Sequence, residues 1–443
     1  MGPLIRNIAA ITILALPLGP FANAQQPAPA AAKQPEVKRV VLKAGRLLDV
    51  RTGKITADTV VLIENDRIAN IGGTVPAGVS VIDLSGLTVL PGLIDAHDHI
   101  LGNPKDWSPA AGLRTSAPEA AIWGVRNLQI LLDHGFTGVR DACEGLGHDY
   151  GQVALRNGID KGLIRGPRIA AAGSCISLTG GHGDEDVLAP GHELPRLPNI
   201  ADTVDQINMA VRHDVKYGVD WIKLMATGGV MDPMSDFHVQ ELSEEQMTRA
   251  VEVARRAGKR VMAHAEGTEG IKAAVRAGVD SIEHGTLLDD EGAELMARKG
   301  TWLVPTLETF QRGPTVAASL GSDPASIAKQ KAILPLQQAA FETALKHRVK
   351  IAYGVDDDPE YVSKEFGVLV RGGLSPLGAI QAATVNAAEL LGWAKDLGAI
   401  EAGKFADIVA VNGDPLADIS VMERVVFVMK GGEVVKNDLD RPR

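Results

Sequence analysis

Residues 90–99 read Leu-Pro-Gly-Leu-Ile-Asp-Ala-His-Asp-His, an apolar segment that runs into two histidines with one residue between them. The apolar part predicts a buried β-strand, in which residues two apart point to the same side. His97 and His99 could therefore reach one ion from the end of one strand. Imidazole suits zinc and its neighbours in the transition series, so this stretch predicts a metal site. The alternative is two unrelated polar residues at the start of a loop.

Other apolar segments also end in residues that can bind a metal. His264 and His284 each end one such segment, and Asp356 ends a third. The chain has only 11 histidines, and four of them fall at these strand ends. Histidines scattered through a core would not show this pattern, which therefore favours a shared site.

Short apolar segments alternate with helical stretches between residues 91 and 397, a pattern typical of a parallel sheet. Two of the helical stretches, 244–257 and 269–277, carry apolar residues at three- and four-residue spacing. Eight such units predict an α/β fold, a (β/α)8 TIM barrel, whose strand ends converge on one mouth. A doubly wound open sheet is the rival, but no Gly-x-Gly-x-x-Gly motif opens a helix after the first strand. The eight strand candidates end near His97, Asp141, Ser174, Lys223, His264, His284, Thr306 and Asp356.

The segments on either side of the barrel have a different pattern of apolar and turn-forming residues. Residues 38–90 and 398–436 contain short strand candidates separated by Gly, Asp and Pro turn signals. We expect the N- and C-terminal segments to pack together as one small β-sandwich domain. A chain of 443 residues, 45% of them hydrophobic, can bury the cores of both domains.

The N-terminus predicts export. Residues 1–24 have the form of a signal peptide, with Arg6 before an apolar run and a predicted cut after Ala24. A membrane anchor is the alternative, but the run is short for spanning a bilayer, and no stable membrane anchoring is expected. Residues 25–37, rich in Pro, Ala and Gln, predict a disordered lead-in. The mature protein should be periplasmic or secreted, and its net charge of −10 argues against binding nucleic acid.

The chain has two cysteines, Cys143 and Cys175. Export would permit a disulfide, but a chain of this size does not need one. The spacing matches no Cys-x-x-Cys metal motif. We expect two separate buried residues.

His97-x-His99, a lysine, two further histidines and an aspartate, in this order across a barrel with a flanking β-sandwich, resemble the metal-dependent amidohydrolase superfamily. The resemblance covers about residues 38–436. Within it, the segments 177–184, 222–229 and 281–286 are similar to the branch of Xaa-Pro dipeptidases, Xaa-Arg carboxypeptidases and ochratoxin A amidohydrolases.

The resemblance implies a centre of two divalent metal ions, with zinc the expected metal. His97, His99 and Asp356 would hold one ion, and His264 and His284 the other. Lys223, carboxylated on Nζ, would bridge them, because an ammonium has donors only; a lysine that pairs with a substrate carboxylate is the alternative. A hydroxide between the ions would attack the amide. Asp356 would pass a proton to the leaving amine, or would be a ligand only.

The branch implies hydrolysis of an amide bond to a C-terminal amino acid, in a dipeptide, an N-acyl amino acid or an ochratoxin A-like amide. His182, in a Gly-rich loop, is expected to act in catalysis by contacting the substrate, although it could be a surface residue. Arg140 could bind a substrate carboxylate or serve as a structural salt-bridge partner. Relatives often assemble, so a homo-oligomer is expected. The alternatives are an imidazolonepropionase-like hydrolase of a cyclic amide or lactone, and a non-catalytic scaffold.

Overall fold

The computed structural model describes residues 37–145, 149–192, 194, 197–356 and 358–439. The predicted signal peptide and all but residue 37 of the predicted lead-in lie outside these ranges. The described residues from 38 onward form one compact unit. Among the described residues, no helix has both the length and the apolarity needed to cross a bilayer.

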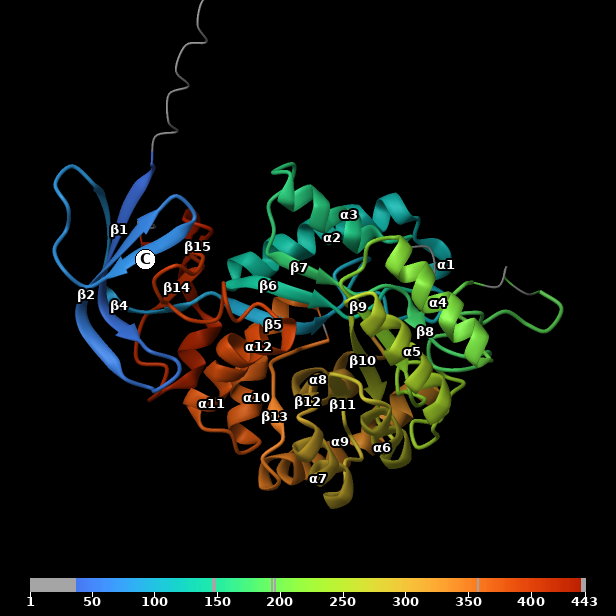
Figure 1. Cartoon of the computed structure of the whole chain (residues 1–443). Coiled ribbons are helices and arrows are strands. Elements are labelled where there is room, and N and C mark those ends of the chain that lie inside the picture. Colours follow the sequence, from blue (N-terminus) through green and yellow to red (C-terminus); the bar gives the residue numbers. More distant parts are fainter. Residues whose placement is uncertain (1–36, 146–148, 193, 195–196, 357, 440–443) are drawn as a thin grey trace, which may run out of the picture. The chain divides into compact units, whose positions relative to one another are not determined.

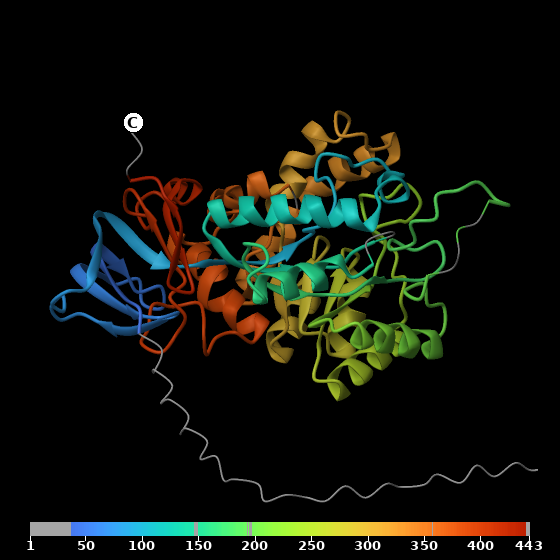
Figure 2. The ribbon, with the colours of Figure 1, turned by 90° about the horizontal axis from the view of Figure 1, so that it is seen from above.

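A seven-stranded sheet contains strands from both ends of the chain. Strands β4 and β14 join the two ends in antiparallel register, from Pro91 opposite Ile408 to Thr88 opposite Val411. The blue N-terminal and red C-terminal strands lie side by side in both views (Figure 1 and Figure 2). In sheet order, the strands are β16 (Glu433–Asn437), β15 (Val425–Lys430), β14 (Ile408–Val411), β4 (Ser80–Pro91), β1 (Arg39–Leu48), β2 (Ile55–Glu64) and β3 (Arg67–Ile71).

The core of this sheet domain draws on both ends of the chain. Leu42, Ile63 and Leu84 from the N-terminal strands share one buried cluster with Ile408 and Phe427 from the C-terminal strands. The domain is thus made as the sequence predicts, from both terminal segments. Hydrogen bonds join all seven strands into one continuous sheet. This follows from the pairing of β4 with β14, which the sequence pattern does not reveal.

The barrel consists of two parallel arcs. The first arc is β5-β6-β7 and the second runs from β8 to β13. Backbone bonds join the arcs, from Ala96 N to Tyr353 O at 2.8 Å on one side and from Asp220 N to Ala171 O at 2.7 Å on the other. The strands are β5 (Leu93–Asp98), β6 (Phe136–Asp141), β7 (Arg168–Ala171), β8 (Cys175–Ile176), β9 (Trp221–Met225), β10 (Arg260–Ala265), β11 (Ser281–His284), β12 (Trp302–Val304) and β13 (Lys350–Ile351).

The third barrel position is divided between two short strands. The sequence predicts one strand ending near Ser174, but β7 ends at Ala171 and β8 begins at Cys175. β7 pairs with β6, whereas β8 pairs with β9. The barrel ladder is therefore interrupted at this point.

Helices cover the outside of the barrel (Figure 1). Two of them match the predicted stretches closely, α5 (Glu244–Arg256) and α6 (Thr268–Ala277). α5 begins with a capping box, in which the Ser243 and Gln246 side chains bind each other's backbone N–H groups. The other helices include α1 (Ala111–Arg114), α2 (Ala117–Asp133), α3 (Gly151–Asp160), α4 (Val204–Lys216), α7 (Asp290–Lys299), α8 (Leu307–Val316), α9 (Pro324–Lys346), α10 (Glu365–Arg371), α11 (Pro376–Gln381) and α12 (Ala387–Leu391).

Candidate metal centre and its pocket

A cavity of about 330 Å³ lies at the carboxyl ends of the barrel strands. This end of a (β/α)8 barrel is where side chains from different strands converge. Seven of the eight residues predicted for the site line the cavity, namely His97, His99, His182, Lys223, His264, His284 and Asp356.

Three of these residues form a compact set of possible metal ligands. His97, His99 and Asp356 each offer a ligand atom, and these atoms lie within 4.8 Å of one another. Oδ1 of Asp356 is 3.2 Å from Nε2 of His99 and 3.5 Å from Nε2 of His97. Nε2 of His97 is buried without a hydrogen-bond partner in the described part of the chain. A divalent cation would satisfy this nitrogen, and two imidazoles with a carboxylate are a donor set that zinc accepts.

The Nδ1 atoms of His97 and His99 each contact a hydrogen-bond acceptor outside the cluster. Nδ1 of His97 lies 2.6 Å from Oε2 of Glu283, and Nδ1 of His99 lies 2.7 Å from the carbonyl oxygen of Cys143. Both acceptors favour the tautomer with hydrogen on Nδ1. The two Nε2 atoms are then left with lone pairs for a metal ion.

Asp356 reaches the cluster through an unusual backbone conformation. It follows the end of β13 by five residues and has a φ of 60°, in the left-handed region that costs a non-glycine residue energy. Its backbone N–H donates to the carbonyl oxygen of His97 at 2.8 Å, which fixes it against β5. Burial raises the pKa of Asp356, but His97 and His99 hold it well below its usual range. The carboxylate is therefore ionised, as a metal ligand must be.

His284 lies against the same carboxylate. Its Nε2 is 4.0 Å from Oδ2 of Asp356, and its Nδ1 is 2.7 Å from Oγ1 of Thr306. Like Asp356, it has a positive φ, 70°. A fourth possible ligand is thus held at the edge of the cluster.

Lys223 is fully buried in the middle of β9 and lines the cavity. Burial lowers the pKa of Lys223 to about 8, against the opposing effects of Glu283 and Asp356. A neutral amine, unlike an ammonium, has a lone pair that can react with an electrophile.

His264 is less closely associated with the cluster. Its Nε2 lies 3.1 Å from the carbonyl oxygen of Gly228. Its ring centroid is 4.8 Å from that of His284 and 4.4 Å from that of His182. The structure therefore brings five imidazoles to one cavity, but His264 does not direct Nε2 at the His97–His99–Asp356 cluster.

His182 is fixed in the cavity wall by two carboxylates. Its Nδ1 lies 2.6 Å from Oδ2 of Asp232, and its backbone N–H donates to Glu241. Burial raises the pKa of Asp232, but the hydrogen bonds from His182 and Ser235 bring it below its usual value. The ring packs over Gly229, where an added Cβ would lie 2.3 Å from its Cε1 atom. Only glycine allows this approach.

Arg140 does not line the cavity, and the prediction that it binds a substrate carboxylate is wrong. The side chain is fully buried and donates to Ala96 O, Ser281 Oγ and both carboxylate oxygens of Glu283. Its guanidinium also lies 4.5 Å from the ring centre of Trp221. Arg140 is the structural salt-bridge partner that its alternative interpretation describes.

Sequence reasoning missed two carboxyl groups beside the cluster. Glu266 lines the cavity two residues after His264, and it is 1% exposed. Glu283 precedes His284 and binds His97 from behind. The alternation of residues at strand ends could have indicated Glu266. No local pattern could have paired Glu283 with His97, since 186 residues separate them.

The cavity also has an apolar wall that the sequence did not predict. It comes from the loop after β5, the loop after β9 and helix α8. Its residues are Leu101, Pro104, Trp107, Val230, Met231 and Phe310.

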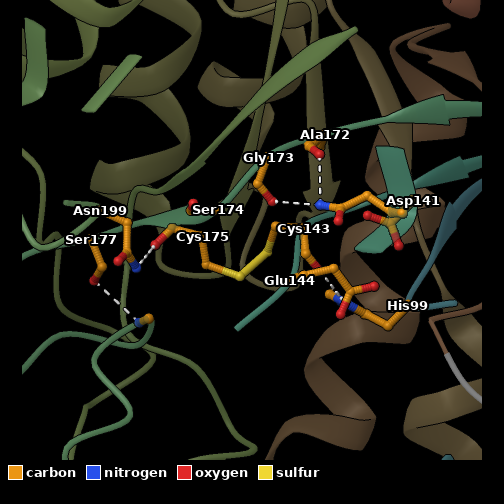
Figure 3. The surroundings of a disulfide bond; sticks show 12 residues. His99, Asp141, Cys143, Glu144, Ala172, Gly173, Ser174, Cys175, Ser177 and Asn199 are labelled. Carbon is orange, nitrogen blue, oxygen red and sulfur yellow. Dashed lines mark hydrogen bonds between the residues drawn. A yellow bond between two sulfur atoms is a disulfide. The ribbon is translucent and has the colours of Figure 1, made fainter. Parts of the chain in front are cut away.

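The two cysteines form a disulfide, so the expectation of separate cysteines is wrong. Cys143 follows β6 and Cys175 begins β8 (Figure 3). Their sulfur atoms meet beside the carbonyl group that accepts the hydrogen bond from His99.

Comparisons with known proteins identify relatives of this chain. The sequence profile of the amidohydrolase family matches residues 88–435. The ochratoxinase of Aspergillus niger is 32% identical over 430 residues, which cover 90% of this chain and 87% of the enzyme. A Xaa-Pro dipeptidase crystallised with methionine in its active site superposes with a TM-score of 0.84 at 32% identity, over 90% of this chain and 100% of that one. The crystal structure of the A. niger ochratoxinase gives 0.79 at 32% identity, over 91% and 96% of the two chains.

Proposed function

The chain belongs to the amidohydrolase family, and from this premise we propose that it hydrolyses the amide bond to a C-terminal amino acid in a small substrate. The substrate would be a dipeptide, an N-acyl amino acid or an amide similar to ochratoxin A. The observation that carries the proposal is the cluster of His97, His99 and Asp356 at the floor of a cavity with an apolar wall. The similar ochratoxinase and Xaa-Pro dipeptidase support the choice of substrate class.

The proposed centre holds two divalent ions, with zinc the expected metal. His97, His99 and Asp356 would bind the first ion, and His264 and His284 the second after the His264 ring turns from Gly228. Lys223, carboxylated on Nζ, would lie between the ions. Bound divalent ions would acidify a water molecule and polarise the substrate carbonyl.

In this proposal Asp356 moves the proton. Its carboxylate faces the cavity, so it would accept a proton from the attacking water and deliver it to the leaving nitrogen. His182, whose Nδ1 is bound to Asp232, keeps Nε2 for a polar group of the substrate. The apolar wall, with Trp107 and Phe310, would receive the side chain or acyl group of the substrate.

We further propose that the protein is exported after cleavage behind Ala24, and that it forms a homo-oligomer. The Cys143–Cys175 disulfide supports an oxidising compartment, because glutathione keeps most cytosolic thiols reduced. N-terminal sequencing of the protein from the periplasm or medium should begin at Gln25. Light scattering of this material should give a mass that is a multiple of the chain mass.

The function is tested by measuring metal content and products together. Purified protein would be analysed for bound metal, then incubated with ochratoxin A, carbobenzoxy-amino acids, dipeptides and cyclic amides, with products identified by mass spectrometry. We expect two ions per chain, release of a free amino acid, and loss of turnover after chelation that added zinc restores. Turnover of cyclic amides alone would replace the proposal with a cyclic amidase. Full turnover in metal-free protein would contradict the metal centre.

A further inference from the structure

The residues of the proposed centre are divided between the two arcs of the barrel. His97 and His99 lie at the end of β5 in the first arc. Lys223, His264 and His284 lie on β9, β10 and β11 in the second. The geometry of the centre therefore depends on how the two arcs are held together.

The junction between β13 and β5 is held by the backbone beside the ligands themselves. Ala96 N donates to Tyr353 O at 2.8 Å, and the N–H groups of Val355 and Asp356 both donate to His97 O. These bonds fix Asp356 directly against His97. No additional link is needed on this side.

The junction between β7 and β8 is where the ladder is interrupted, and here the disulfide crosses it. Cys143 follows the last residue of β6 by two positions, and Cys175 is the first residue of β8. Few backbone bonds cross here: Glu144 N donates to Gly173 O at 3.1 Å beside the isolated bridge between Glu144 and Ser174, and Asp220 N donates to Ala171 O at 2.7 Å. The disulfide is thus a covalent link between the arcs at the point where their sheets are separate.

Each end of this link contacts a residue of the centre. On the first arc, the carbonyl oxygen of Cys143 accepts the hydrogen bond from Nδ1 of His99 at 2.7 Å (Figure 3). On the second arc, Cys175 is the register partner of Lys223. A shift of Cys143 relative to Cys175 would therefore change the position of His99 relative to Lys223.

The link is buried and lies close to the cavity. Cys143 and Cys175 are 0% and 7% exposed and pack against Met225, which lines the cavity. Asn199 donates to the carbonyl oxygen of Cys175 at 2.9 Å. The loop that carries His182 packs on the same residue, because a Cβ on Gly183 would lie 3.0 Å from that oxygen.

From this arrangement we propose that the Cys143–Cys175 disulfide positions His99 against the second arc and thereby sets the affinity of the site formed by His97, His99 and Asp356. The disulfide takes no part in the chemical step. This inference rests on the proposed metal centre. It also implies that the protein reaches full metal affinity only after oxidation of this cysteine pair.

The test compares the zinc affinity of metal-free wild type with that of Cys143→Ala, Cys175→Ala and the double variant, by competition with a chromophoric chelator. Losing a group that orients a metal-binding histidine typically weakens the metal roughly 10- to 100-fold, and we expect a loss in this range. The three variants should lose the same factor, because either substitution removes the link while the backbone carbonyl of residue 143 remains. Wild type reduced by a phosphine under anaerobic conditions, and freed of it before titration, should show the same loss and recover on reoxidation.

Val139→Ala is the matched control, since Val139 is buried on β6 and its truncation leaves the disulfide intact. It should lower the midpoint of thermal unfolding without changing zinc affinity. Wild-type affinity in the double variant or in the reduced protein would overturn the proposal, as would an equal loss of affinity in Val139→Ala. Wild-type protein that binds no divalent ion would instead overturn the proposed function, and this inference with it.

Discussion

Oε2 of Glu283 lies 2.6 Å from Nδ1 of His97, and both side chains are fully buried. The other side of the carboxylate is bound by the guanidinium of Arg140, with Nη2 2.9 Å from Oε1. Burial raises the pKa of Glu283, but Arg140 and His97 lower it to about 2. An ionised carboxylate therefore holds the first histidine of the cluster, and an arginine that never reaches the cavity keeps it ionised.

Glu283→Gln should weaken zinc binding at the His97 site. The glutamine amide retains the shape of the side chain but removes the charge that favours hydrogen on Nδ1 of His97. The expected loss is roughly 10- to 100-fold in affinity, measured by chelator competition. Unchanged zinc affinity would mean that Glu283 serves the fold and not the metal.

Arg140→Met should lower the free energy of unfolding by about 3–5 kcal/mol, because it leaves the buried charge of Glu283 without its partner. Denaturant unfolding measures the change. Arg39→Ala is the matched control, since Arg39 and Glu64 form an exposed pair whose loss should cost less than about 1 kcal/mol. Similar costs for both substitutions would contradict the buried role.

Gly229→Ala should displace His182, because the new Cβ would lie within 2.3–2.6 Å of three atoms of the imidazole ring. We expect a higher KM with little change in zinc content, since His182 is proposed to contact the substrate and not the metal. Gly86→Ala is the control, because Gly86 has open space for a Cβ and no positive φ. A wild-type KM in Gly229→Ala would show that His182 does not take part in substrate binding.

Phe310→Ala should lower kcat/KM most for substrates with a large aromatic group. Phe310 is buried in the apolar wall, with its ring centroid 5.6 Å from that of His284. Losing apolar contact in a pocket costs about 1–3 kcal/mol, or roughly 10- to 200-fold in discrimination. Substrates with a small acyl group serve as the internal control. An equal fall for both kinds of substrate would place the aromatic group elsewhere.

Asp214→Asn should reduce the loss of stability that occurs as the pH rises from 4 to 7. Burial raises the pKa of Asp214 to about 6, although bonds from Tyr150 and Ser174 oppose this. The folded state thus holds the proton more tightly than the unfolded state, whose pKa is near 3.8, so this contribution to stability is present below pH 4 and lost as the pH rises through 6. Its size is about 3 kcal/mol, at roughly 1.36 kcal/mol per pKa unit.

Unfolding of metal-free wild type and Asp214→Asn at several pH values measures this effect as the difference between the two proteins. The difference should increase in favour of the variant between pH 4 and 7. A constant difference would show that Asp214 keeps its ordinary pKa in the folded protein.

The amino-acid pattern was sufficient for the parts of the fold and site that local periodicity encodes. The His97-x-His99 alternation and the strand-end positions of His264 and His284 predicted residues that do line one cavity. The helical stretches at 244–257 and 269–277 were predicted almost to their ends because their apolar faces repeat at helical spacing.

Features that depend on long-range register could not be predicted in this way. The position of Arg140 near a strand end predicted contact with a ligand. In the folded chain, groups on β5 and β11 bind its guanidinium instead. The disulfide joins residues 32 positions apart whose proximity follows from the interruption between β7 and β8. The single sheet formed by the two terminal segments likewise depends on the pairing of β4 with β14.

That last pairing determines when the protein can finish folding. During synthesis, one edge of β4 stays unpaired until β14 has emerged, because Pro91 pairs with Ile408, more than 300 residues later in the chain. Contacts of such sequence separation form slowly and leave strand edges exposed to aggregation. A chain truncated before Ile408 would keep every residue proposed to bind metal, yet it would carry an uncovered strand directly before β5. Recombinant production should therefore favour slow synthesis at low temperature over removal of the C-terminal segment.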